Sequence, residues 1–311
     1  MLQNFIISVQ AVLPLFFMMM LGFLIQKKQW LDQDELTRLN SVIFKLLFPF
    51  AVFNSIYHTK LSESLHPKLI AFSVTGILLI YIIALLIVPK IEKNNASRSA
   101  MIQASYRSNF VLLGLPLVTN LYPNSDLGMT AIAIAVLIPI YNILAVLTFE
   151  AYRGGKANPK RILRNIITNP LIIGCIAGIV ATPLPIPTVI AHTISQLSAT
   201  ATPMAIILLG ATFQLNHNLN MKWNVLICTF SRLLLFPGIF LSLAAFWGFR
   251  GLSFATLLGI FSTPCSVSSF TMAQQMDSDG ELAGATVIFT SIFSCFTMCF
   301  WIFIFKQFGI L

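Results

Sequence analysis

Two clusters of polar residues interrupt long apolar stretches of the sequence. Each lies at a helix-breaking point, the first just before Gly114-Leu115-Pro116 and the second around Pro264. Polar groups in hydrocarbon are costly unless they face a cavity or a partner, so these clusters are where chemistry is expected. The first cluster is Gln103, Ser105, Tyr106, Arg107, Ser108 and Asn109, and the second is Ser262, Thr263, Ser266, Ser268, Ser269, Thr271, Gln274 and Gln275.

A helix that is broken inside a membrane exposes two kinds of backbone group. The unpaired N–H groups at the start of its second half, together with the positive dipole end, favour an anion such as a carboxylate. The unwound carbonyls, with Ser and Asn oxygens, favour a cation. The sequence therefore permits both a substrate-anion site and a coupling-ion site. The alternative is a polar seam that only ties helices together.

Three other polar features lie deep in apolar segments. Arg107 either compensates the charge of an anion or extends to the cytoplasmic interface. Arg232 is expected to pack internally or to snorkel in the same way. Asn142, which follows Pro139-Ile140-Tyr141, either faces inward toward a ligand or makes an interhelical hydrogen bond.

The motifs of familiar enzyme sites are absent from the sequence. There is no His-Glu-x-x-His pattern, no pair of aspartates within an apolar run and no glycine-rich phosphate loop beside a lysine. The serines of the two clusters have no His or Asp close in sequence to act as a base. We therefore predict no enzyme activity, no catalytic residues, no metal set and no cofactor. The coupling ion stays open between H⁺ and Na⁺.

The elements that carry these residues are predicted to be membrane-spanning helices. The 311 residues are 57% hydrophobic and 9% charged, with a mean hydropathy of +0.85, whereas soluble domains carry about 25% charged residues. Apolar runs of about 20 residues match the roughly 30 Å of hydrocarbon that a helix must cross. We predict an all-α protein with ten spans, at 5–26, 37–57, 68–89, 99–121, 128–150, 165–183, 188–213, 222–247, 253–274 and 283–306.

The net charge of +9 is explained by topology rather than by nucleic-acid binding, because the basic residues lie in short loops beside the spans. Twelve of them fall on one side of the membrane and four on the other. Since Lys and Arg concentrate on the cytoplasmic side, both termini are predicted to face away from the cytoplasm. The twelve are Lys27, Lys28, Arg38, Lys90, Lys93, Arg98, Arg153, Lys156, Lys160, Arg161, Arg164 and Lys222, and the four are Lys60, Lys68, Arg250 and Lys306.

The ten spans divide into two halves. The basic segment 153–164 separates five spans in residues 1–152 from five in residues 165–311. An odd number of spans per half inserts the second half upside down, which is a recurrent transporter architecture. Pro203 follows Pro49 by 154 positions, and Pro264 follows Asn109 by 155. The matching offsets predict an inverted repeat whose helices 4 and 9 are both broken.

Five stretches of the sequence together resemble the auxin efflux carrier family, which includes bacterial malate and malonate carriers and the plant PIN proteins. The family is distantly related to the sodium/bile-acid symporters. The short connection between the halves matches the bacterial type. The five stretches are Arg107-Ser108-Asn109-Phe110-Val111-Leu112-Leu113-Gly114-Leu115-Pro116, Pro139-Ile140-Tyr141-Asn142-Ile143-Leu144, Asn169-Pro170-Leu171-Ile172-Ile173, Pro203-Met204-Ala205-Ile206-Ile207-Leu208-Leu209-Gly210-Ala211 and Pro264-Cys265-Ser266-Val267.

The resemblance implies a fold in which broken spans four and nine cross near the membrane midplane. Spans one, two, six and seven would form a scaffold, kinked at Pro49 and Pro203, and the other six would move against it like an elevator. Arg107 would offer charge compensation beside the substrate. The implied substrate-binding residues are Ser108, Asn109, Phe110, Asn142, Pro264, Cys265, Ser266 and Ser268.

The expected function is secondary transport of a small organic anion, such as malate, malonate or an auxin-like acid. A channel or a non-transporting receptor for a small ligand is the alternative. Expected partners are the organic anion and membrane lipids, with a homodimer left open, and nucleic acid is not expected. The expected location is a bacterial cytoplasmic (inner) membrane.

Overall fold

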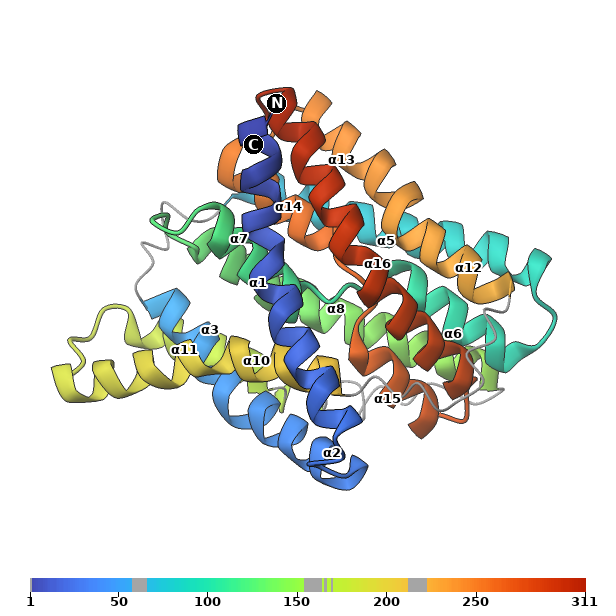
Figure 1. The fold of residues 1–311 in the computed structure, drawn as a ribbon, viewed down its shortest axis with the longest axis horizontal. Coiled ribbons are helices and arrows are strands. Elements are labelled where there is room, and N and C mark those ends of the chain that lie inside the picture. Colours follow the sequence, from blue (N-terminus) through green and yellow to red (C-terminus); the bar gives the residue numbers. More distant parts are fainter. Residues whose placement is uncertain (1, 58–65, 154–163, 165–166, 169, 212–222) are drawn as a thin grey trace.

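The protein is described by a computed structural model that covers all residues except 1, 58–65, 154–163, 165–166, 169 and 212–222 (Figure 1). Within the described part of the chain the regular structure is helical. The first half contains α1 (Leu2–Lys27), α2 (Gln33–Val42), η1 (Ile43–Leu47), α3 (Phe48–Tyr57), α5 (Pro67–Ile91), α6 (Asn95–Tyr106), η2 (Phe110–Gly114), α7 (Leu115–Leu121) and α8 (Gly128–Arg153). The second half contains α10 (Pro170–Ala181), α11 (Thr188–Ala211), α12 (Trp223–Phe230), η3 (Ser231–Leu235), α13 (Phe236–Phe246), α14 (Gly251–Ser262), α15 (Val267–Gln275) and α16 (Gly280–Gln307).

Four helical stretches among the described residues are long and apolar enough to cross a membrane. They are Pro67–Ile91, Gly128–Tyr152, Trp223–Phe246 and Gly280–Gln307. Shorter apolar helices cover Leu13–Lys27, Phe110–Leu121 and Gly251–Ser262. An all-helical membrane protein is therefore confirmed. The predicted linker 153–164 lies almost wholly outside the described residues.

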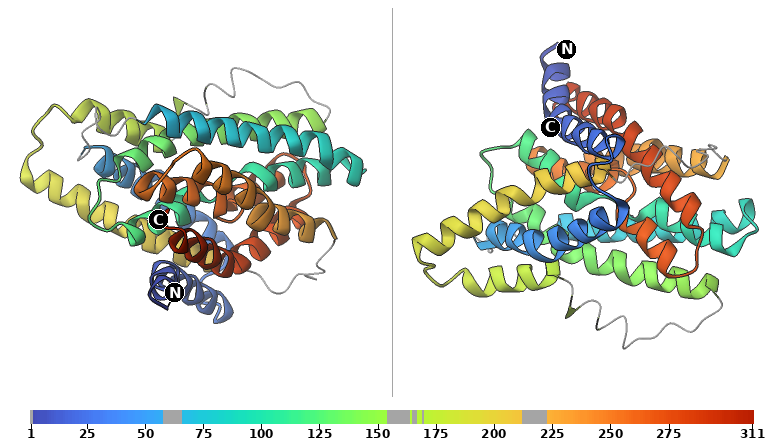
Figure 2. Two further views of the ribbon diagram at one scale, coloured as in Figure 1. Left: turned by 90° about the horizontal axis from the view of Figure 1, so that it is seen from above. Right: turned by 60° about the horizontal axis from the view of Figure 1, so that its bottom comes forward.

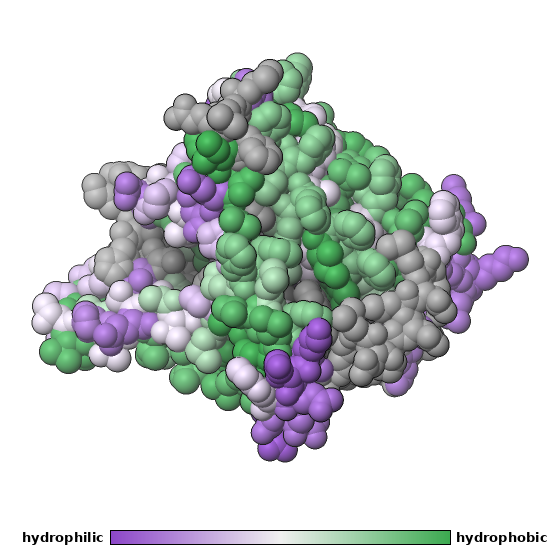
Figure 3. All heavy atoms as spheres, in the orientation of Figure 1, coloured by the Kyte–Doolittle hydropathy of each residue, from purple (hydrophilic) through white to green (hydrophobic). Residues whose placement is uncertain are grey.

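The apolar surface is continuous over the middle of the molecule, and hydrophilic residues gather at its extremities. Figure 3 shows the hydrophilic residues over α2 and over the turn that joins α5 to α6. Large apolar side chains such as Phe17, Leu86 and Phe296 are more than half exposed. A surface of this kind is stable only when lipid covers it. The two chain ends lie close together at one end of the molecule (Figures 1 and 2).

Three helices widen by one residue per turn just before a proline. In η1, η2 and η3 the hydrogen bonds span five residues, for example from the Phe236 N–H to the Ser231 carbonyl. Each segment ends two residues before its proline, which is Pro49, Pro116 or Pro237. Proline has no N–H and its ring clashes with the preceding turn, so a π-helical turn accommodates it. Around Pro203, by contrast, α11 runs without interruption, and the kink there stays a prediction.

The carbonyl that Pro237 leaves without a helical partner is that of Leu233, four residues earlier. The Trp301 indole N–H on α16 donates to it over 3.0 Å. A carbonyl without a partner in a membrane interior is costly, so this bond ties α16 to the widened helix. It also keeps η3 in place, where the neighbouring Arg232 lies.

Replacing Trp301 with Phe removes this donor while most of the ring volume remains. The net loss of one hydrogen bond of about 1 kcal/mol should lower the unfolding temperature in detergent by about 2–4 °C. Trp223→Phe is the control, because Trp223 is largely exposed. Equal unfolding temperatures for the two variants would show that the indole N–H contributes nothing.

Candidate functional site

The two predicted helix breaks meet in the structure. Helix α6 ends at Tyr106 and η2 begins at Phe110, while α14 ends at Ser262 and α15 begins at Val267. The two connecting segments, 107–109 and 263–266, run antiparallel and pair at Ser108 and Cys265. We call this pair of segments the crossover.

Two main-chain hydrogen bonds hold the crossover. The Asn109 N–H donates to the Pro264 carbonyl over 2.8 Å. The Ser266 N–H donates to the Arg107 carbonyl over 3.2 Å. Backbone groups that no longer take part in helices are thereby satisfied inside the membrane region, as they must be where water is absent. The two polar clusters are thus brought together where these segments pair.

Arg107 lies inside the protein, not at its surface. Its side chain is 7% exposed. One guanidinium nitrogen donates to the Asn142 Oδ1 of α8 over 2.9 Å, and another contacts the Met272 Sδ of α15 at 3.1 Å. Of the two readings of the sequence, extension to the interface is therefore excluded. Asn142 makes an interhelical hydrogen bond, and its oxygen orients the guanidinium.

The other predicted site residues differ in what they contact. The Ser108 hydroxyl is 2.8 Å from the Tyr141 hydroxyl of α8. Ser266 and Ser268 are partly exposed and share a 2.8 Å hydrogen bond at the start of α15. Phe110 is fully buried, and its ring lies where a Cβ on Gly114 or Gly259 would be. Phe110 therefore packs the crossing of η2 and α14.

Pro264 and Cys265 complete the predicted set and are both buried. The Pro264 carbonyl and the Cys265 N–H are engaged in the frame of the crossover, the latter donating to the Thr290 Oγ1 of α16 over 3.2 Å. The backbone groups of these two residues therefore stabilise the crossover. Their side chains are left to shape the space beside it.

Asn109 holds a buried donor without a partner. Its side chain is 2% exposed, and among the residues that the structure describes none is a hydrogen-bond partner of its Nδ2. Leaving such a group unpaired costs about 1–3 kcal/mol. Next to it in the crossover, Ser266 is the N-cap residue of α15, and its side chain makes no capping hydrogen bond. Both features offer N–H groups to an acceptor, and an anion is the strongest acceptor available.

Arg232 also contacts the crossover and is 1% exposed. Its Nε donates to the Thr263 carbonyl over 2.9 Å, and its Nη2 donates to the Ile260 carbonyl over 3.0 Å. The third contact, from Nη1 to the Ser105 carbonyl, is 3.4 Å long. Packing inside the protein is therefore the correct reading for Arg232, and snorkelling is wrong. The guanidinium stays inside because three main-chain oxygens surround it.

A comparison with known families decides the class of this protein. Residues 7–302 match the family model described as "Membrane transport protein". The chain belongs to this family. Its members are transporters and not enzymes, which agrees with the absence of enzyme motifs, and membership confirms the resemblance to the auxin efflux carriers. The chain is also similar to an "Uncharacterized transporter" of Methanothermobacter thermautotrophicus, with 23% identity over 297 residues, 94% of this chain and 97% of that protein.

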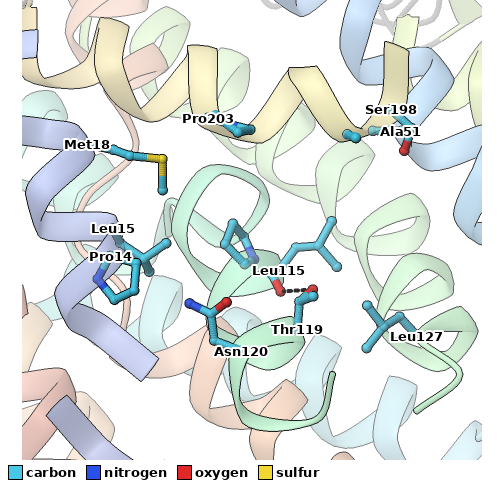
Figure 4. A pocket seen from close by; sticks show the side chains of 12 residues that line it. Pro14, Leu15, Met18, Ala51, Leu115, Thr119, Asn120, Leu127, Ser198 and Pro203 are labelled. Carbon is cyan, nitrogen blue, oxygen red and sulfur yellow. Dashed lines mark hydrogen bonds between the residues drawn. The ribbon is translucent and has the colours of Figure 1, made fainter. Parts of the chain in front are cut away.

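The transporter has a cavity of about 380 Å³ between α1, α3, α11 and α7 (Figure 4). Helices α1, α3 and α11 form one wall, with Pro14, Ala51 and Pro203, and the η2–α7 helix forms the other. The cavity is mostly apolar. Its polar lining groups are Thr119, Asn120 and Ser198. Of the predicted site residues only Pro203, a predicted kink, lines it; none of the predicted substrate-binding residues does.

Several residues that shape the site of this transporter were not singled out from the sequence. Tyr141, Met272 and Thr290 contact the crossover from α8, α15 and α16. An aromatic residue, a methionine and a threonine in apolar spans carry no distinctive signal. Arg232 was noted in the sequence as a deep charge, but its contacts with the crossover were not predicted.

Proposed function

We propose that this transporter carries a small organic anion, such as a mono- or dicarboxylate, and binds it at the crossover. The observation that carries the proposal is the buried Arg107. Within the described part of the chain, the hydrogen-bond partners that the structure gives Arg107 are neutral: an amide oxygen and a thioether. A thioether is a weak acceptor. A buried cation with such partners is costly, and a carboxylate would offset that cost with a charge-assisted hydrogen bond.

Other polar groups at the crossover fit the same ligand. The free Nδ2 of Asn109 and the uncapped start of α15 are donors, and Ser266 and Ser268 add hydroxyl groups. A carboxylate accepts from several donors at once. We therefore assign direct contact to Asn109, Ser266 and Ser268 and charge compensation to Arg107, while Asn142 and Ser108 hold the surrounding network. Phe110, Pro264 and Cys265 shape the space.

The proposed architecture is an inverted repeat of five spans, residues 1–152 and 165–311 joined by the linker 153–164. Two close helix contacts support it. Helices α1 and α11 approach until a Cβ on Gly22 would lie 1.8 Å from the Ile207 carbonyl oxygen, and a Cβ on Gly174 of α10 would lie 2.5 Å from the Pro49 carbonyl oxygen of α3. The first contact joins spans one and seven, and the second joins spans six and two. In an inverted repeat of five spans, span six corresponds to span one and span seven to span two, so the two contacts are equivalent. Small residues permit such contacts in membranes.

We further propose an elevator motion of spans three, four, five, eight, nine and ten against the other four. The cavity lies along this division, because α1, α3 and α11 belong to the scaffold and α7 to the moving body. With both termini outside the cytoplasm, α7 leads to the external face, so the cavity is the external approach to the substrate. The proposed location is the cytoplasmic membrane of a bacterium.

Two measurements test the function. A screen of carboxylates by thermal unfolding in detergent should find one that raises the unfolding temperature, because a ligand that binds only the native state stabilises it, by about 2.7 kcal/mol at 100 times its Kd. The same compound should show saturable counterflow in liposomes. Conductance without saturation or exchange would instead favour the channel, and binding without counterflow would favour a receptor.

Asn109→Ala tests the site itself. We expect the variant to fold normally and to bind the carboxylate about 10- to 100-fold more weakly, since it loses one hydrogen bond to a charged group. The control is Asn95→Ala on the same broken span, where Asn95 is exposed and accepts from Arg98. Binding at the affinity of the unmodified protein in Asn109→Ala would place the site elsewhere.

A further inference from the structure

The carbonyl ends of both broken helices point at one side chain. The Ile260 carbonyl lies in the last turn of α14 and the Thr263 carbonyl belongs to its C-cap residue, while the Ser105 carbonyl lies in the last turn of α6. All three accept from the guanidinium of Arg232. Two helix C-termini from different halves of the chain therefore converge on a single cation.

Helix C-termini attract positive charge. Each carries roughly half a negative elementary charge, together with carbonyls that have no partner within the helix. In transporters with broken helices, such carbonyls coordinate Na⁺. A coupling sodium ion is therefore the ligand that this part of the fold would ordinarily take, and the sequence alone left it open.

The residues present do not fit a sodium ion. A sodium ion needs several oxygens directed at one point, and here three of those oxygens are already directed at a guanidinium. The guanidinium keeps its charge and offers five donors in a planar fork, so it satisfies several carbonyls at once. Arg232 thus supplies, as a permanent part of the chain, the single positive charge that a sodium ion would bring.

The neighbouring helix is built to hold Arg232 in this position. The residue lies in the π-helical segment η3. The Trp301 indole N–H donates to the carbonyl of the following residue, Leu233. The guanidinium is 1% exposed, and within the described part of the chain its partners are neutral main-chain oxygens. The charge of Arg232 is therefore directed at the helix ends, whereas Arg107 faces Asn142.

We propose that Arg232 is a positioning residue that takes the place of a coupling sodium ion, so that the crossover is assembled without Na⁺. The proposal rests on the proposed function, in which the crossover is the transport site. With both carbonyl ends neutralised by Arg232, the N–H ends and Arg107 remain for the substrate anion. No step of transport then requires sodium at the crossover.

The test uses thermal unfolding of the purified full-length protein, with NaCl exchanged for choline chloride. The unfolding temperature of the unmodified protein should not depend on the exchange. Arg232→Ala should lose on the order of 10 °C in choline, because it leaves three buried carbonyls without donors. Adding Na⁺ or methylguanidinium should restore much of that loss in a saturable way, since a cation can then enter the vacated space.

Arg250→Ala is the matched control. Arg250 also donates to two main-chain carbonyls, Ala245 and Phe249, but it is exposed. Its variant should respond to neither cation. If Arg232→Ala does not yield folded protein, Arg232→Lys replaces it in the test. The lysine variant should fold but be less stable than the unmodified protein, because one ammonium cannot reach all three carbonyls.

Three results would overturn the proposal: a saturable stabilisation of the unmodified protein by Na⁺, an Arg232→Ala variant that no cation stabilises, or one as stable as the parent. If Arg232→Ala yields no folded protein, an Arg232→Lys variant as stable as the parent would do the same. None of these measurements contains an organic anion. Failure of the carboxylate screen would therefore be distinguishable from failure of the role assigned to Arg232.

Discussion

Replacing Arg107 with Gln should weaken carboxylate binding by roughly 100- to 1,000-fold. Two unit charges 4 Å apart interact by about 4 kcal/mol in surroundings of intermediate polarity, which is close to a thousandfold in affinity. Gln keeps a hydrogen-bonding group near Asn142, so the network with α8 is partly preserved. Removing a buried charge with neutral partners should at the same time leave the unliganded protein as stable as before, or more stable. Isothermal titration and thermal unfolding measure the two effects.

The matched control for Arg107→Gln is Arg98→Gln on the same helix. Arg98 donates to the Glu92 and Pro89 carbonyls and to Asn95 at the turn between α5 and α6, away from the crossover. Its loss should reduce stability slightly and leave affinity unchanged. If Arg107→Gln binds as tightly as the parent, or if Arg98→Gln lowers affinity equally, the charge of Arg107 does not serve the substrate.

The second large effect is expected where α1 crosses α11. A Cβ on Gly210 would lie 1.9 Å from the Met19 carbonyl oxygen, and one on Gly22 would lie 1.8 Å from that of Ile207. Because these neighbours are main-chain atoms, no side chain can rotate away to make room for the added methyl group. The two helices would have to move apart. Gly22→Ala and Gly210→Ala should each lose about 3 kcal/mol or more, which corresponds to about 6–12 °C in unfolding temperature.

The expected loss of stability is opposite in sign to the usual effect of Gly→Ala in a helix. In an ordinary helix, Gly→Ala stabilises by about 1 kcal/mol because alanine has the better helix propensity. Gly238→Ala on α13 is the control, since its Cβ would meet only the edge of the Trp301 ring at 3.3 Å. Stabilisation by Gly22→Ala and Gly210→Ala would mean that α1 and α11 do not cross at this point.

The helices and their breaks were predictable because each depends on local composition. Apolar length predicts where a span lies, and Pro264 predicts where one ends, so the observed bounds fall within a few residues of those expected. The matching offsets predicted only that the two breaks occupy corresponding positions in the two halves, and their meeting was implied by the family resemblance; the pairing of Ser108 with Cys265 itself was not predicted.

Other features depended on contacts that local sequence does not contain. The depth of Arg232 in the sequence is compatible with snorkelling, and only the carbonyls of Ile260 and Thr263 decide against it. The three π-helical segments could not be predicted from the sequence either. A proline within a span does not always widen its helix, since α11 continues uninterrupted past Pro203. The cavity depends on how helices far apart in sequence pack, and no residue in its lining marks it.

The backbone pairing of the crossover has a consequence for how such carriers diversify. Asn109, Pro264, Ser266 and Arg107 are joined there through main-chain N–H and carbonyl groups. Every amino acid except proline supplies both groups. The side chains that we propose to face the ligand can therefore be exchanged without dismantling the frame that aligns them. A change of cargo should need only a few substitutions at Ser266, Ser268 and their neighbours, which makes these positions the natural starting point for redesigning selectivity.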